Sequence, residues 1–266
     1  MSEALNIAYA AIDRDNAEQS AHTRRRFVGG AAAAMGSMGL LGLVNNDQAH
    51  AQMLQNDAQT ILNVAATAEV LATIVNTVGP EKLRPRTIIR NGRRVADPRR
   101  LNKVTNRNVR AAAREELIHY NVLTGALGAT PLAKKIWVPN AVFASPRGLL
   151  TTLEAGDQIF INAYLIGTTV FGNAGKGKEA RFTGEFMGTE AVHRALARQS
   201  LGKLGNDRVF MKYSFSKIGD AVKLLEAAGI GFGKKGASPG RFYNFDEVKT
   251  RTPSVGSTRV NTLLPN

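Results

Sequence analysis

Two pairs of residues with the same spacing could bind a metal ion. Glu116 precedes His119 by three positions and Glu190 precedes His193 by three positions, and these are the only histidines after residue 51. On an α-helix, residues i and i+3 share one face and lie about 4.5 Å apart along the axis. Each pair can therefore direct one carboxylate and one imidazole at a common ion.

Two further stretches each offer an acid among apolar residues. Glu69 is the only charged residue of the apolar stretch 58–78, and Glu154 lies between Leu150 and Ile161, with Asp157 one turn later. An ionised carboxylate at a core-facing position is costly unless a cation or a hydrogen-bond donor compensates it. In chain order, the four stretches present Glu, Glu-x-x-His, Glu and Glu-x-x-His.

Four long helices must position these residues. Apolar periodicity, with Gly and Pro near the ends, predicts helices over about 57–78, 101–127, 147–171 and 178–201, and a shorter fifth helix over about 214–228. Residues 81–103 are rich in Lys and Arg and contain the turn signal Asn91-Gly92, which predicts an irregular basic loop with a short hairpin. Because little of the chain alternates like a strand, we predict an all-α bundle over residues 52–230, followed by an extended C-terminal tail over 231–266.

The order of these ligand types resembles the di-metal carboxylate site of the ferritin-like superfamily. The chain is most similar to its exported, desiccation-related branch, as a ferritin-like four-helix bundle with an added fifth helix, basic loop and tail. The resemblance implies that Glu116 and Glu190 bridge two metal ions and that His119 and His193 each bind one of them. It also implies that Glu69 and Glu154 are terminal ligands, and that Asp157 is either a ligand or the partner of a histidine.

The resemblance implies a function but leaves the reaction open. Two iron or manganese ions are expected, with iron favoured, and they would react with O₂ or peroxide as in a ferroxidase, peroxidase or catalase that protects against stress. One alternative is a non-catalytic structural or desiccation-type stress protein of the cell envelope. Its basic loop at 82–103 would contact a polyanion. Another alternative is a decayed site, in which the Glu and His residues form buried hydrogen-bonded pairs.

The first 51 residues resemble a twin-arginine export signal. The segment Thr23-Arg24-Arg25-Arg26-Phe27 is followed by an apolar run over 28–44 and by a small-x-small cleavage site at 49–51. We expect the twin-arginine translocase to export the folded chain to the periplasm or the cell exterior, with a mature form that begins at Gln52. Retention of the signal as a membrane anchor is the alternative. We expect no later stretch to be apolar enough to span a bilayer.

Composition narrows the chemistry further. The chain has 266 residues and no cysteine, which excludes disulfides, thiolate metal sites and a cysteine nucleophile. A metal must therefore be held by carboxylate, imidazole or backbone oxygen. The formal net charge of +14 leaves an anionic partner open, and a homo-oligomer is also open.

Overall fold

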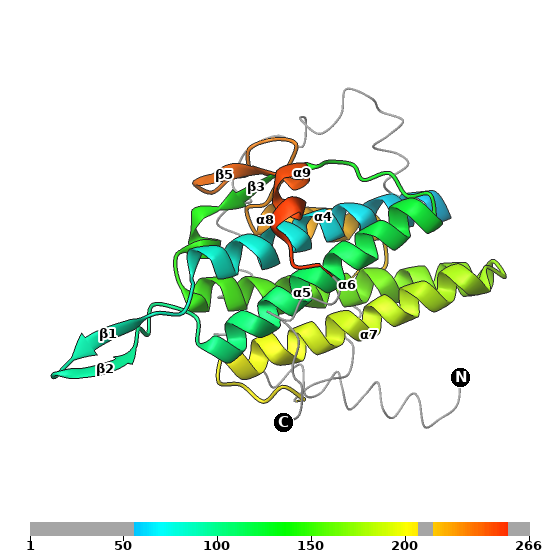
Figure 1. Ribbon diagram of the computed structural model, residues 1–266. Coiled ribbons are helices and arrows are strands. Elements are labelled where there is room, and N and C mark those ends of the chain that lie inside the picture. Colours follow the sequence, from blue (N-terminus) through cyan, green and yellow to red (C-terminus); the bar gives the residue numbers. More distant parts are fainter. Residues whose placement is uncertain (1–55, 207–214, 255–266) are drawn as a thin grey trace, which may run out of the picture. The chain divides into compact units, whose positions relative to one another are not determined.

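The computed structural model describes residues 56–206 and 215–254, all of which belong to one compact unit. The predicted export signal at 1–51 lies outside the described residues, as does the end of the predicted tail, residues 255–266. The described part of the chain is mostly helical (Figure 1), in agreement with the predicted fold class at that level.

Four long helices form the main body of this unit. They are α4 (Ala58–Lys82), α5 (Lys103–Asn121), α6 (Pro146–Asn173) and α7 (Gly177–Ser200), and a shorter helix, α8, covers Ile218–Ala227. Side chains cap three of the long helices at the N-terminus: Asp57, Asn102 and Ser145 each accept a hydrogen bond from a backbone N–H of the first turn. The predicted helices therefore all form, with ends shifted by a few residues.

The long helices pack as two antiparallel pairs. α4 lies against α5 and α6 against α7, and the pairs meet through α4 with α6 and through α5 with α7 (Figure 1). Gly167 of α6 allows one close approach, because a Cβ there would lie 2.9 Å from Cγ2 of Thr183 in α7. The turn between α6 and α7 includes Gly175, whose positive φ of 68° suits glycine.

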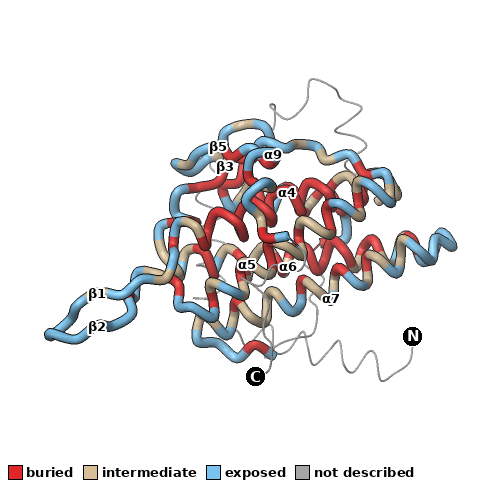
Figure 2. The backbone as a smooth tube through the Cα atoms, viewed as in Figure 1, coloured by how far each residue is buried: buried red, intermediate tan, exposed pale blue. Residues whose placement is uncertain are grey.

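α4 is the central helix of the core. Nearly its whole length is buried (Figure 2), so it needs no polar face. Among the described residues, α4 is also the one helix with the length and hydropathy of a bilayer span, and 94% of its apolar window is buried inside the protein. The expectation that no later stretch has such a composition is therefore wrong, although a buried core helix passes the same test.

The basic segment between α4 and α5 forms a hairpin. Strands β1 (Thr87–Arg90) and β2 (Arg93–Ala96) pair antiparallel around Asn91 and Gly92, which both have positive φ. Two consecutive positive φ values are typical of the tight turn that the Asn-Gly pair predicts. The hairpin projects from the helices (Figure 1), and its residues are almost all exposed.

The C-terminal part is not an extended tail over residues 231–254. Strand β3 (Lys135–Pro139) pairs antiparallel with β4 (Gly231–Phe232) on one side and with β5 (Gly240–Asn244) on the other, and the short helix α9 (Phe245–Val248) follows. The glycines allow close backbone packing here, since a Cβ on Gly231 would lie 2.1 Å from the carbonyl oxygen of Lys234. The prediction of an extended tail misinterpreted glycines that a compact turn requires.

Candidate metal centre

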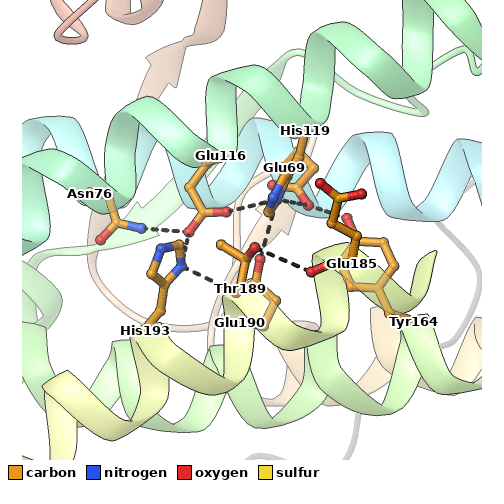
Figure 3. Close-up of polar contacts among 9 residues, drawn as sticks. All are labelled: Glu69, Asn76, Glu116, His119, Tyr164, Glu185, Thr189, Glu190 and His193. Carbon is orange, nitrogen blue, oxygen red and sulfur yellow. Dashed lines mark hydrogen bonds and ion pairs between the residues drawn. The ribbon is translucent and has the colours of Figure 1, made fainter. Parts of the chain in front are cut away.

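Three of the long helices bring four predicted ligands together at the centre of the core. Glu69 comes from α4, Glu116 and His119 from α5, and Glu190 from α7 (Figure 3). One ligand atom from each residue lies within 4.8 Å of the corresponding atom of every other residue. The three glutamates are 0% exposed and His119 is 4% exposed. This buried cluster has a composition and spacing that could hold a metal ion.

Two glutamates lie between the two imidazoles. Oε2 of Glu116 is 3.7 Å from Nδ1 of His119, and its Oε1 is 3.1 Å from Nδ1 of His193. Glu190 repeats the arrangement, with Oε1 3.6 Å from the His119 nitrogen and Oε2 3.6 Å from the His193 nitrogen. Each carboxylate thus presents one oxygen to each side, which is the geometry that a bridging carboxylate needs.

The two sides of the cluster each have one further acid. Oε1 of Glu69 lies 3.3 Å from Nδ1 of His119. On the other side, Asp157 of α6 is 3% exposed and interacts electrostatically with His193 and Glu190. With His193 and Asp157 added, the cluster comprises six residues and divides into two halves, each with one imidazole and one acid of its own.

Glu154, predicted as a terminal ligand, is not brought to this cluster. Its carboxylate forms ion pairs with Nη1 of Arg198 at 2.8 Å and with Nζ of Lys203 at 2.5 Å. In the antiparallel pair α6–α7, Asp157 and His193 are equally far from Gly175 along the chain, whereas Glu154 lies one turn further from it. The prediction that Glu154 is a terminal ligand is therefore corrected, and Asp157 is the acid of α6 that interacts with His193 and Glu190.

Two polar side chains that the sequence analysis missed hold the acids in place. The Tyr164 hydroxyl donates a hydrogen bond to Oε1 of Glu69, and Nδ2 of Asn76 donates one to Oε1 of Glu116 at 3.2 Å (Figure 3). The ring of Phe186 stacks against His119 with a centroid distance of 4.1 Å. Tyr164 on α6 and Phe186 on α7 are equally far from Gly175 along the chain, so the antiparallel pairing of these helices could have predicted that the two side chains lie side by side. No comparable signal in the sequence marks Asn76.

Several polar atoms of the cluster remain without a hydrogen-bond partner among the described residues. They are Glu69 Oε2, Glu116 Oε2, both carboxylate oxygens of Glu190, Asp157 Oδ2 and Nδ1 of both histidines. Buried polar atoms are normally hydrogen-bonded, and an unpaired buried carboxylate is costly. All seven are oxygen or imidazole nitrogen atoms, the donor types that divalent cations bind. The donor set therefore fits a cation better than it fits a self-contained hydrogen-bonded cluster.

Electrostatic coupling within the cluster shifts its titrating groups. Burial, followed by the charge of Glu190, raises the pKa values of Glu116 and Asp157 well above their usual range. Burial alone would lower the pKa of His119, but Glu69, Glu190 and Glu116 together raise it to about 10. Burial raises the pKa of Tyr164, so its hydroxyl keeps the proton that it donates to Glu69. The negative field that retains these protons would also attract a cation.

Comparison with known proteins yields no match to a family model, to a curated protein or to a solved structure. The residues and geometry of the buried cluster are therefore the observations that bear on function.

Proposed function

We propose that the protein is a ferritin-like di-metal carboxylate protein that binds two ions between α4, α5, α6 and α7. The observation that carries this proposal is the placement of Glu116 and Glu190, whose paired oxygens divide between His119 and His193. In the proposed assignment, Glu69 completes the His119 half and Asp157 completes the His193 half.

Charge supports two ions in place of one. If all four acids ionise on metal binding, Glu69, Glu116, Asp157 and Glu190 carry four negative charges in a buried space. Two divalent cations neutralise these charges while both imidazoles stay neutral, as metal ligation requires. A single divalent cation would leave two buried negative charges, which burial penalises.

The ligand set favours iron or manganese, and we propose iron. Four carboxylates and two imidazoles give each ion mainly oxygen ligands, whereas structural zinc sites usually have four ligands, mostly sulfur or nitrogen. A pair of such ions supplies electron exchange with O₂ or peroxide, the chemistry of a ferroxidase, peroxidase or catalase. The protein's own part is to exclude water through burial and to orient Glu69 and Glu116 through Tyr164 and Asn76.

Metal analysis followed by turnover tests this function. We expect the purified protein to contain about two ions of iron or manganese per chain, in keeping with a paired-metal site. His119→Ala and Glu190→Ala should lose metal, whereas Glu154→Gln, at the nearby ion pair with Arg198 and Lys203, should keep it. Consumption of O₂ or H₂O₂ by the iron-loaded protein would then identify the reaction. Wild-type protein that binds no Fe²⁺ or Mn²⁺ would refute the proposal.

The hairpin favours a second candidate function, contact with an anionic surface. Arg90 and Arg93 lie directly opposite each other, and Arg94 lies opposite Ile89, which is 68% exposed. Within the described residues, no ion pair is found for these three arginines. Like charges on facing positions repel each other, so nothing among these residues compensates the positive charge of the hairpin. A non-catalytic stress protein of the cell envelope could bind lipid or another polyanion through this hairpin.

Export through the twin-arginine translocase remains part of the proposal. The segment at 23–27 carries it, and insertion of metal before export would be consistent with a pathway that transports folded proteins. The expected location is the periplasm or the cell exterior.

A further inference from the structure

A small cavity reaches the His193 half of the cluster. It has a volume of about 20 Å³ and is lined by α5, α6 and α7, with Asn76 of α4 at its inner end. Asp157 and His193 form part of its wall. We call this space the axial cavity, because its lining follows the helices.

The lining residues recur at helical spacing along all three helices. The inner positions are Ala112, Asp157 and His193, and the outer positions, seven residues away on the same helices, are Thr105, Leu150 and Ser200. Seven residues correspond to about 10 Å along a helix. At the outer end, the hydroxyl of Thr105 donates a hydrogen bond to that of Ser200 at 3.0 Å, and Ser200 is partly exposed. The axial cavity therefore extends from near the surface between α5 and α7 towards the candidate metal centre.

The middle of the axial cavity is apolar. Val109, Leu153 and Ala197 contribute most of the surface there, Asn108 adds one uncharged polar side chain, and no charged side chain of the described residues lines this middle part. A hydrated ion would lose its water shell at such a surface, which is costly. The volume is close to the minimum that holds one water molecule, so organic substrates do not fit.

We infer that the axial cavity is the entry route for O₂ and that it restricts the substrate to a small uncharged molecule. This inference rests on the proposed di-metal function. O₂ needs no hydrogen-bond donors along its path, and apolar buried space accepts such gases. An oxidase for a larger organic substrate is not compatible with this route.

Dissolved O₂ offers a test that does not depend on metal binding. O₂ is paramagnetic and speeds the relaxation of nearby methyl groups, which NMR measures on the metal-free protein under O₂ pressure. We expect a larger effect on the methyls of Val109 and Leu153 than on those of Ile61 and Ile161, which are each 1% exposed and do not line the axial cavity. Equal effects on all four residues would overturn the inference.

A pair of matched variants tests the route in turnover. Val109→Phe fills the axial cavity, and Val64→Phe makes the same change in a second cavity that touches Tyr164. Val109→Phe should slow oxidation of bound Fe²⁺ by about tenfold or more, with Val64→Phe within about twofold of wild type. Anaerobic Fe²⁺ binding should be unchanged in both.

Other outcomes separate the two proposals. Slower oxidation in Val64→Phe but not in Val109→Phe would assign entry to the second cavity and overturn the inference. If Val109→Phe does not fold, Val109→Ala widens the axial cavity and should not slow oxidation, whereas slower oxidation would contradict the route. If H₂O₂ oxidises the bound Fe²⁺ and O₂ does not, the entering molecule is peroxide and the inference for O₂ is overturned. Wild-type protein without bound Fe²⁺ would refute the di-metal function, and the NMR measurement would still decide access of O₂.

Discussion

Asp157→Asn is expected to weaken metal binding and Glu154→Gln to leave it unchanged, although the two acids lie one turn apart on α6. Asp157 is buried beside His193 and Glu190, whereas Glu154 is paired with Arg198 and Lys203. Each substitution removes one carboxyl group that can ionise and keeps the side-chain shape. Their comparison therefore asks which acid belongs to the metal centre.

The expected magnitudes follow from binding linkage. A free metal concentration one hundred times the Kd stabilises the folded state by about 2.7 kcal/mol per site. Two sites give about 5 kcal/mol, and loss of the His193 half in Asp157→Asn should remove roughly half of it. For a domain of this size, roughly 2–4 °C per kcal/mol converts this loss to a decrease of about 5–11 °C in the metal-induced rise of Tm.

The metal-free proteins should behave differently. Burial raises the pKa of Asp157, so its ionised form is unfavourable and Asp157→Asn should leave the metal-free Tm unchanged or higher. Glu154→Gln loses its ion pairs with Arg198 and Lys203, and the resulting loss of stability should be equal with and without metal.

Calorimetry of chelator-treated protein, with and without Mn²⁺, measures the metal-free Tm and its metal-induced rise. Mn²⁺ is used because it avoids oxidation of the metal during the scan. If Glu154→Gln loses the metal-induced rise of Tm while Asp157→Asn retains it, the assignment of Asp157 is wrong. An equal rise in both variants and in wild type would show that neither acid is a ligand.

Four other perturbations test the support of the ligands, their protons, the hairpin and the export signal. Tyr164→Phe removes the hydrogen bond to Glu69 and should weaken binding of one ion by about 10- to 100-fold in a Mn²⁺ titration; two unchanged affinities would contradict its role. In metal-free protein, the raised pKa of His119 stabilises the fold fully below its unfolded value of about 6.5, and this contribution is lost as pH rises towards about 10. The rise of Tm caused by Mn²⁺ should therefore grow between about pH 6 and pH 9, and a constant rise would argue against displacement of this proton. Replacing Arg90, Arg93 and Arg94 with Gln should weaken binding to anionic vesicles by about 3 kcal/mol at low salt, with the Lys versions as control, and equal binding would exclude the hairpin. Replacing Arg24 and Arg25 with Lys should retain the precursor in the cytoplasm, and continued export would remove the twin-arginine argument.

The sequence by itself predicted the features that depend on local physics. Helix periodicity and capping depend on residues a few positions apart, so the four long helices and α8 were predicted within a few residues of their ends. The Asn91-Gly92 pair predicted the hairpin for the same reason. Glu69 was recognised because a single acid in a fully apolar helix must lie in the core. The two Glu-x-x-His pairs predicted ligands on α5 and α7, since their spacing is a property of one helix, and the structure brings Glu116, His119 and Glu190 into the buried cluster.

Only the tertiary structure decided how the helices face one another. Glu154 and Asp157 are both compatible with an inward face of α6, and the antiparallel register with α7 places Asp157 beside His193 and Glu154 beside Arg198. The contact of Asn76 with Glu116 joins α4 to α5 across a connection whose length carries no register information. The glycine-rich residues 231–240 were predicted as part of an extended tail, because their pairing with β3 is a contact between distant parts of the chain. The register between helices, the hydrogen bonds of Asn76 and Tyr164 to the glutamates, and the pairing of distant strands are all set by packing between elements. Local sequence patterns do not encode this packing.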